Sequence, residues 1–126
     1  MIVLDSSALL ALLNQEPGAE KLTADLLTTS ICSAVNIAEV HTKLVMRGMT
    51  QRDAWTAAVT SVHEIVDFTM QQARQVGDLA AGTRSIGLSL GDRACLALAM
   101  ELEVPVYTAD RAWKKLRLPV QIHSIR

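Results

Sequence analysis

Aromatic residues are scarce in this 126-residue chain, which has only Trp55, Phe68, Tyr107 and Trp113. Their scarcity argues against an aromatic surface on which nucleic-acid bases stack, as single-strand binding modules have. Charge of one sign is also lacking, since 12 lysines and arginines stand against 13 acidic residues and give a formal net charge of -1. Without a general basic field, any nucleic-acid partner has to be held by local contacts.

The chain has two cysteines, Cys32 and Cys95, and both stand among apolar or small neighbours. This setting favours buried free thiols over a disulfide framework or a zinc site, and it suggests a reducing compartment. The N-terminus has no signal-peptide pattern, and no apolar run is long enough to span a bilayer. We therefore expect a cytoplasmic protein with no membrane segment. It should form one domain, residues 1–126, because half of its residues are hydrophobic and can build a core.

Short apolar segments alternate with segments of helical periodicity along the chain. Strands are expected at residues 2–4, 30–34, 63–68 and 104–109, with a possible fifth at 120–125. Helices are expected at residues 7–14, 18–29, 35–48, 51–62, 69–82 and 88–103. Strands separated by helices pair in parallel through right-handed crossovers. The pattern predicts an α/β fold, a three-layer α/β/α sandwich with a central, mainly parallel sheet of four to five strands.

Four acidic residues are predicted to meet at one edge of this sheet. Asp5 follows the first strand and Asp110 follows the fourth, so both emerge at the carboxyl ends of parallel strands. Asp92 stands near the start of the helix that leads into the fourth strand, and Glu39 stands about one turn into the helix after the second strand. Both positions lie near the same edge, where ligands bind in open α/β sheets.

Each of these acids also has a purely structural explanation. Asp5 and Asp110 suit helix N-caps, and Asp92 in a first turn suits the helix dipole. Glu39, taken alone, is more often a surface residue. The joint pattern carries more weight, because capping gives four acids no reason to share one edge of a sheet.

A cluster of four carboxylates needs a cation or raised pKa values. Two such charges at about 4 Å repel by about 4 kcal/mol at an effective dielectric constant near 20. Oxygen ligands without cysteine or histidine select a hard ion, Mg²⁺ or Mn²⁺, bound through a few carboxylates together with substrate phosphate oxygens. The chemistry that follows is metal-assisted hydrolysis of a phosphodiester. The three histidines lie on different predicted elements and are assigned no part in it.

Four segments carry a family resemblance: "MIVLDSSALLALL", "SAVNIAEV", "GLSLGDRACLALA" and "VPVYTADRAWKKL". With them the chain resembles the PIN-domain ribonucleases, and most closely the VapC-type toxins of bacterial toxin-antitoxin pairs. The four segments stand in family order and span most of the chain. Each is short, and their combination at these separations is the specific signal.

The resemblance implies a metal-dependent endoribonuclease. Asp5, Glu39, Asp92 and Asp110 would be the catalytic acids that hold Mg²⁺ or Mn²⁺. Ser6, Ser7 and Thr108 would orient the ligands or metal-bound water, although helix capping and a strand-end hydrogen bond explain these hydroxyls equally well. Arg84 would contact RNA or an antitoxin carboxylate, or it is simply a solvated loop arginine. The resemblance also implies a homodimer and a cognate antitoxin, for which apolar helical segments such as 9–14 and 54–62 offer surface.

Two other classes of function stay open at this point. A receiver-type phosphoacceptor domain has a similar length, a doubly wound sheet and acids at strand ends, and Asp67 would be its acceptor. Against it, the first strand offers one acid where receivers have a pair, and the last strand ends without their lysine. A bare interaction module without catalysis would bind no metal tightly.

Overall fold

The computed structural model describes all 126 residues and contains a five-stranded sheet in which every strand pair is parallel. The strands lie in the order β3-β2-β1-β4-β5. Their bounds are Ile2–Leu4 for β1, Ser30–Ser33 for β2, Glu64–Val66 for β3, Val106–Thr108 for β4 and Ile122–Ser124 for β5. The predicted parallel sheet is confirmed, and the possible fifth strand is present.

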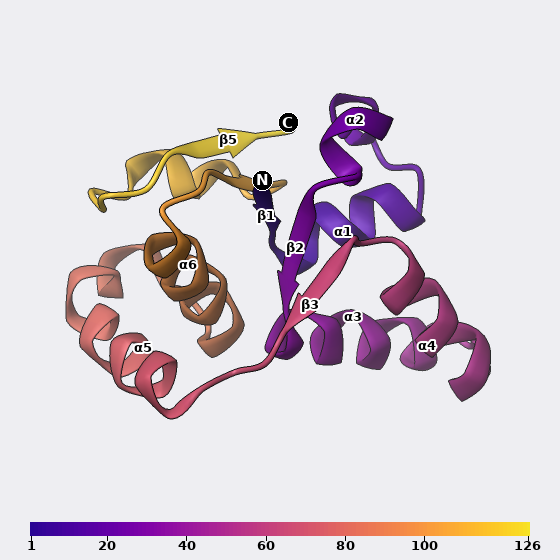
Figure 1. Cartoon of the computed structure of the whole chain (residues 1–126), viewed down its shortest axis with the longest axis horizontal. Coiled ribbons are helices and arrows are strands. Elements are labelled where there is room, and N and C mark those ends of the chain that lie inside the picture. Colours follow the sequence, from indigo (N-terminus) through magenta and orange to yellow (C-terminus); the bar gives the residue numbers. More distant parts are fainter.

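Helices cover both faces of the sheet, as the sandwich prediction requires (Figure 1). One layer contains α1 (Ser6–Leu13), α3 (Ala34–Met46) and α4 (Gln51–Thr60), with the short α2 (Ala24–Leu27) at its end. The opposite layer contains α5 (Met70–Gly82) and α6 (Leu90–Leu102). None of these helices is both long and apolar enough to cross a membrane.

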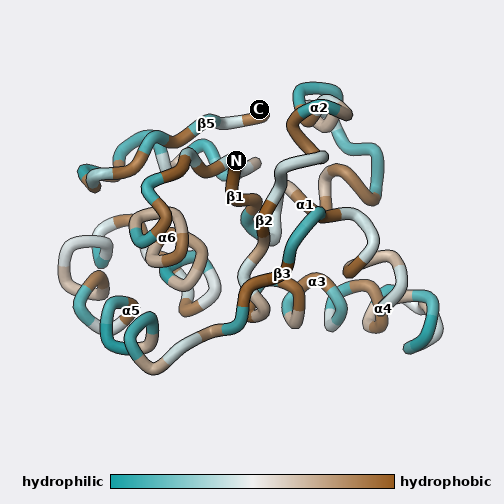
Figure 2. Tube along the Cα trace, viewed as in Figure 1, coloured by the Kyte–Doolittle hydropathy of each residue, from teal (hydrophilic) through white to brown (hydrophobic).

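The two layers enclose separate hydrophobic cores because side chains of a strand alternate between faces. Leu4 and Cys32 belong to the core under α1, α3 and α4, whereas Val3 and Ile31 belong to the core under α6. Brown, hydrophobic stretches accordingly follow β1 and much of α6 in Figure 2, and hydrophilic ones follow the outer turns of α5. Both cysteines are buried free thiols, as predicted.

One predicted helix, residues 18–29, is wrong. The segment contains a 3₁₀ turn at Ala19–Lys21 and then the separate helix α2. Leu22 leaves the helical conformation with its side chain buried, and Thr23 is extended and caps the N–H of Leu26. Gly18 has a φ of 96° and lies so close to the carbonyl of Ile125 that a Cβ there would collide with it. The other predicted elements differ from the observed ones by at most two residues at either end.

The order of the strands reverses beside β1. From β1 the chain moves outward through β2 to β3, and it then crosses to the other side of β1 to form β4 and β5. The carboxyl ends of β1 and β4 therefore flank the point of reversal, where open α/β sheets bind their ligands. Asp5 directly follows β1, and Asp110 comes two residues after β4.

Candidate acidic site

Asp5 lies at the reversal point, where its buried carboxylate joins the ends of β1 and β4. The side chain is only 2% exposed. It caps α1 by accepting the N–H of Ala8 at 2.8 Å, and it accepts the hydroxyl of Thr108 on β4 at 2.6 Å. The hydroxyl of Ser7 lies 2.8 and 2.9 Å from the two carboxylate oxygens.

This burial changes the acidity of Asp5. Desolvation raises its pKa to about 6, and the nearby charge of Asp92 adds a smaller increase. The hydrogen bonds from Thr108, Ala8 and Ser7 act in the opposite direction because they stabilise the ionised form. A carboxylate kept here in spite of its desolvation is typical of a functional site.

Glu39 is half-buried on α3 and points toward the start of α6. Its Oε1 accepts the hydroxyl of Ser6 and, at 2.9 Å, the side-chain amide of Asn36. The carboxylate lies against Gly91 so closely that a Cβ at residue 91 would overlap both of its oxygens. Glu39 therefore occupies a defined place between α3 and α6.

Asp92 and Asp110 lie at the starts of two further helical segments. Asp92 forms a capping box with Ser89 in the first turn of α6, with its Oδ2 2.9 Å from the Ser89 N–H. Burial raises its pKa, and the charges of Glu39 and Asp110 raise it further. Asp110 is exposed and caps the 3₁₀ turn Arg111–Lys115, while its own N–H donates to Thr108 Oγ1 at 3.0 Å.

The structure thus shows the capping geometry of the aspartates together with electrostatic coupling among the four acids. Each aspartate caps a helical segment, as the structural explanation predicted, and electrostatic coupling links Asp92 to Asp5, Glu39 and Asp110. No cation neutralises them, because the two ion pairs of the protein join Arg74 to Asp78 and Arg126 to Glu16. Arg93 instead donates to the carbonyl of Val76.

The carboxylate oxygens of the four acids are the type of ligand that a hard divalent cation prefers. Their side chains, however, do not point to one shared position. One oxygen each of Glu39, Asp92 and Asp110 accepts no hydrogen bond. However, no group of three or more acidic, histidine or cysteine side chains lies close enough to hold one ion. In this arrangement Asp92 and Asp110 are turned toward the backbone N–H groups that they cap.

The three hydroxyl residues predicted to orient the acids contact only two of the four acids. Ser7 and Thr108 contact Asp5, and Ser6 contacts Glu39. Arg84 is exposed in a 3₁₀ turn, Arg84–Ile86, beside the Arg111–Lys115 turn, and it forms no ion pair. Sequence reasoning missed Asn36 and Gly91, whose signals were an asparagine on an otherwise apolar helix face and a glycine in a first turn.

The receiver alternative is not supported by the topology. Asp67 is exposed after β3, an edge strand that β2 separates from β1. The proposed acceptor would therefore stand away from Asp5, with no shared site between them.

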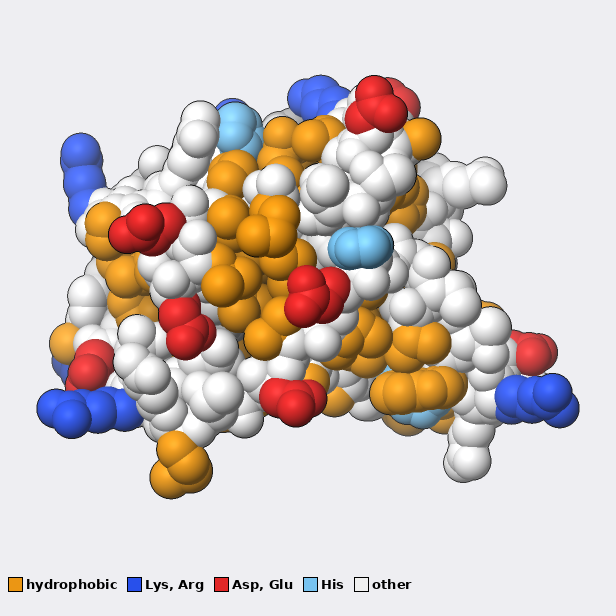
Figure 3. Space-filling model, viewed as in Figure 1, with side chains coloured by type: hydrophobic (Ala, Val, Ile, Leu, Met, Phe, Trp, Pro, Cys, Tyr) orange, Lys and Arg blue, Asp and Glu red, His pale blue; other side chains and the backbone are white.

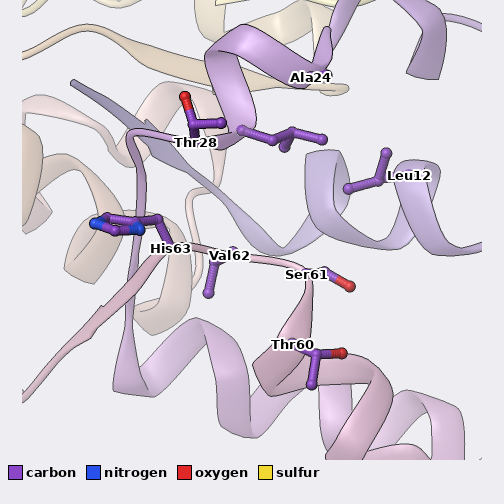
Figure 4. A pocket seen from close by; sticks show the side chains of 8 residues that line it. Leu12, Ala24, Thr28, Thr60, Ser61, Val62 and His63 are labelled. Carbon is purple, nitrogen blue, oxygen red and sulfur yellow. The ribbon is translucent and has the colours of Figure 1, made fainter.

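The largest hollow of the surface, about 510 Å³, contains none of the candidate acids (Figure 4). Leu12 of α1, Thr28 before β2 and His63 before β3 are among the residues that line it. These positions are at the amino ends of β2 and β3, the edge of the sheet opposite the acids. A smaller hollow of about 350 Å³ along α3 includes Glu39 and Lys43.

Replacing Asp5 by asparagine distinguishes a strained site carboxylate from an ordinary helix cap. Because the folded pKa of about 6 exceeds the unfolded value, ionisation of Asp5 costs stability, so the wild-type free energy of unfolding without metal should fall as pH rises from about 4 through 6. Asp5→Asn should show a smaller fall, because only Asp92, whose pKa is also raised, still contributes to it, and should be more stable at pH 7 by about 1–3 kcal/mol. Urea unfolding in EDTA at several pH values measures both. If the free energy of unfolding changes equally with pH in the wild type and in Asp5→Asn, and the variant is less stable at pH 7, Asp5 is only a helix cap.

Comparison with solved structures places the fold among toxin-antitoxin proteins. VapC20 from Mycobacterium tuberculosis, described as a sarcin-ricin loop cleaving toxin, superposes with a TM-score of 0.77 at 21% identity, over 96% of this chain and 99% of that one. The DNA-bound VapBC of Salmonella typhimurium has a TM-score of 0.77 at 13% identity, covering 99% and 98% of the two chains. The DNA-bound VapBC2 of Rickettsia felis has a TM-score of 0.75 at 18% identity, covering 98% of each.

The sequence itself identifies the family. No curated protein matches the chain significantly. The model of the PIN domain, however, matches residues 2–118, which include β1 to β4, all six α-helices and the four candidate acids. The predicted relationship is confirmed, and the chain belongs to the PIN-domain family.

Proposed function

We propose that this protein is a Mg²⁺- or Mn²⁺-dependent endoribonuclease and the toxin of a toxin-antitoxin pair. The observation that carries the proposal is the buried carboxylate of Asp5 at the reversal of strand order, coupled to other acids and paired with no cation. Membership of the PIN-domain family supports it, as does a fold shared with a toxin described as cleaving the sarcin-ricin loop.

Asp5, Glu39, Asp92 and Asp110 would hold the metal ion. When bound, the ion would activate water and stabilise negative charge on the phosphate that is cleaved. The chain supplies orientation: Ser7 and Thr108 fix the carboxylate of Asp5, which spans the two strand ends. The second carboxylate oxygen of Asp92 and of Asp110 accepts no hydrogen bond and would be available to the ion, while the first oxygen keeps its cap.

RNA binding would rely on a few cations close to the acids. Arg111 follows Asp110 directly, and exposed Lys114, Lys115 and Arg117 continue the same segment. Arg84 lies in the turn beside it, and none of these five cations is ion-paired. They would contact phosphates and position the RNA without reading its bases, which suits a protein with few aromatic residues and a net charge of -1.

Cleavage of RNA should require both the metal and the acids. Purified wild-type protein incubated with RNAs that contain single-stranded loops should cut them in Mg²⁺ or Mn²⁺, and EDTA should stop the reaction. Asp92→Asn should lower the rate by about 100-fold, because it removes a ligand while retaining the acceptor of the capping box.

Asp78→Asn provides the matched control, since Asp78 is exposed on α5 in a pair with Arg74. It should cleave RNA at the wild-type rate. Cleavage that persists in EDTA, or an Asp92→Asn rate equal to that of Asp78→Asn, would contradict the proposed mechanism.

An antitoxin and a second copy of the chain would cover exposed hydrophobic surface. Hydrophobic side chains gather on the face shown in Figure 3. Among the exposed hydrophobic side chains of the whole molecule, Met46 is 81% exposed and Trp55 is 51% exposed. Trp55 is on α4, as expected for a partner surface, whereas most of the apolar residues of α1 are buried. Similarity of fold to VapBC proteins supports an antitoxin partner, and we include a homodimer and a cytoplasmic location in the proposal.

Expression of the chain alone in bacteria should slow growth, and Asp5→Asn should restore it. Asp78→Asn should remain toxic, and co-expression of the protein encoded by a neighbouring antitoxin gene should relieve the wild-type effect. Growth curves measure the toxicity, and immunoblots check that the variants are present at equal levels. Equal toxicity of Asp5→Asn at equal level would show that RNA cleavage is not the cause.

A further inference from the structure

A slot between α3 and α6 holds the carboxylate of Glu39. Asn36, one helical turn earlier on α3, forms one wall, and Gly91 in the first turn of α6 forms the other. Asn36 is 1% exposed, so its amide is removed from water and depends on its protein partners. Ser6, at the start of α1, closes the slot at the Oε1 atom.

The orientation of the Asn36 amide follows from its neighbours. Its Nδ2 lies 2.9 Å from Glu39 Oε1, 3.0 Å from the carbonyl oxygen of Gly91 and 3.1 Å from Ser6 Oγ. The carboxylate and the carbonyl can only accept, so the reversed amide would face them with its oxygen. The cost of the observed orientation is that Oδ1 is buried without a hydrogen-bond partner. The three contacts of Nδ2, including the one to Glu39, thus outweigh the loss of a partner for Oδ1.

The second wall depends on the missing side chain of Gly91. A Cβ at this position would overlap both oxygens and the carboxyl carbon of Glu39. Glycine costs about 1 kcal/mol against alanine within a helix, so α6 itself gains nothing from it. The atoms that would be displaced belong to the flexible end of a side chain, and alanine should therefore fold while moving Glu39.

We propose that Asn36 and Gly91 are positioning residues that hold the Glu39 carboxylate beside Asp92, and that the slot sets how tightly the acids bind a divalent cation. This inference rests on the proposed function for its purpose, although the slot can be tested without RNA. Residues that orient metal ligands change metal affinity or activity by about 10–100-fold when mutated.

The first test compares Gly91→Ala with Gly77→Ala, an alanine in α5 whose Cβ would meet nothing within 4 Å. In EDTA, Gly77→Ala should melt at or above the wild-type temperature because alanine favours the helix. Gly91→Ala should stay folded, because the atoms that it displaces are the end of a flexible side chain. Calorimetric titration with Mn²⁺ should show about 10–100-fold weaker binding for Gly91→Ala and wild-type affinity for Gly77→Ala. Wild-type Mn²⁺ affinity in Gly91→Ala would overturn the proposal.

The second test asks whether Gly91 acts through Glu39. In a double-mutant cycle, Gly91→Ala should weaken Mn²⁺ binding in the wild type and have no further effect once Glu39→Ala is present. Additive losses would show that Gly91 acts by another route and would overturn the assignment. Asn36→Ala, which removes the other wall, should likewise be without effect in the Glu39→Ala background.

The third measurement uses neither metal nor RNA. In ¹⁵N-labelled protein the side-chain NH₂ of Asn36 should be protected from exchange, and its signal should shift in Gly91→Ala and Glu39→Ala but stay in place in Gly77→Ala. An unchanged Asn36 signal in Gly91→Ala would overturn the slot even if that variant were inactive. If the wild type binds Mn²⁺ and the variants show these shifts, but the wild type leaves RNA intact, the slot stands and the proposed nuclease is refuted.

Discussion

The hydrogen bond between Thr108 and Asp5 joins the two strands between which the sheet reverses its order. β1 and β4 are neighbours that the chain connects only through β2, β3 and six α-helices, and their carboxyl ends meet at this contact. Because Asp5 also caps α1, one buried carboxylate links the central strand, the first helix and the fourth strand. Local folding and the candidate site thus depend on the same side chain.

The electrostatics of the site follow from that position. Burial raises the pKa of Asp5 and that of the less buried Asp92. The charge of Asp92 raises the pKa of Asp5 further, and the charges of Glu39 and Asp110 raise that of Asp92. Capped N–H groups offset part of the negative charge, while lysines and arginines stay on the surface around the site and form no ion pairs with it. An arrangement that retains acids at this cost is physically reasonable where a cation or a substrate bound through a cation supplies the balancing charge.

Much of this architecture follows from local patterns. The alternation of apolar and helical segments predicts the parallel sheet, and the rule for strand ends places Asp5 and Asp110 at one edge. The break at Leu22 could not be predicted, since it depends on burial of that side chain and on the approach of Gly18 to residue 125. Asn36 and Gly91 escaped notice for a similar reason, because they are 55 residues apart and meet only when α3 packs on α6.

The central claim is that the acids at this edge bind one hard cation together, and crystals grown in Mn²⁺ test it most directly through anomalous diffraction. The account predicts an anomalous peak bonded to the carboxylate of Asp5, with at least one of Glu39, Asp92 and Asp110 turned toward it at about 2.0–2.2 Å. An edge without a peak in millimolar Mn²⁺ would contradict it.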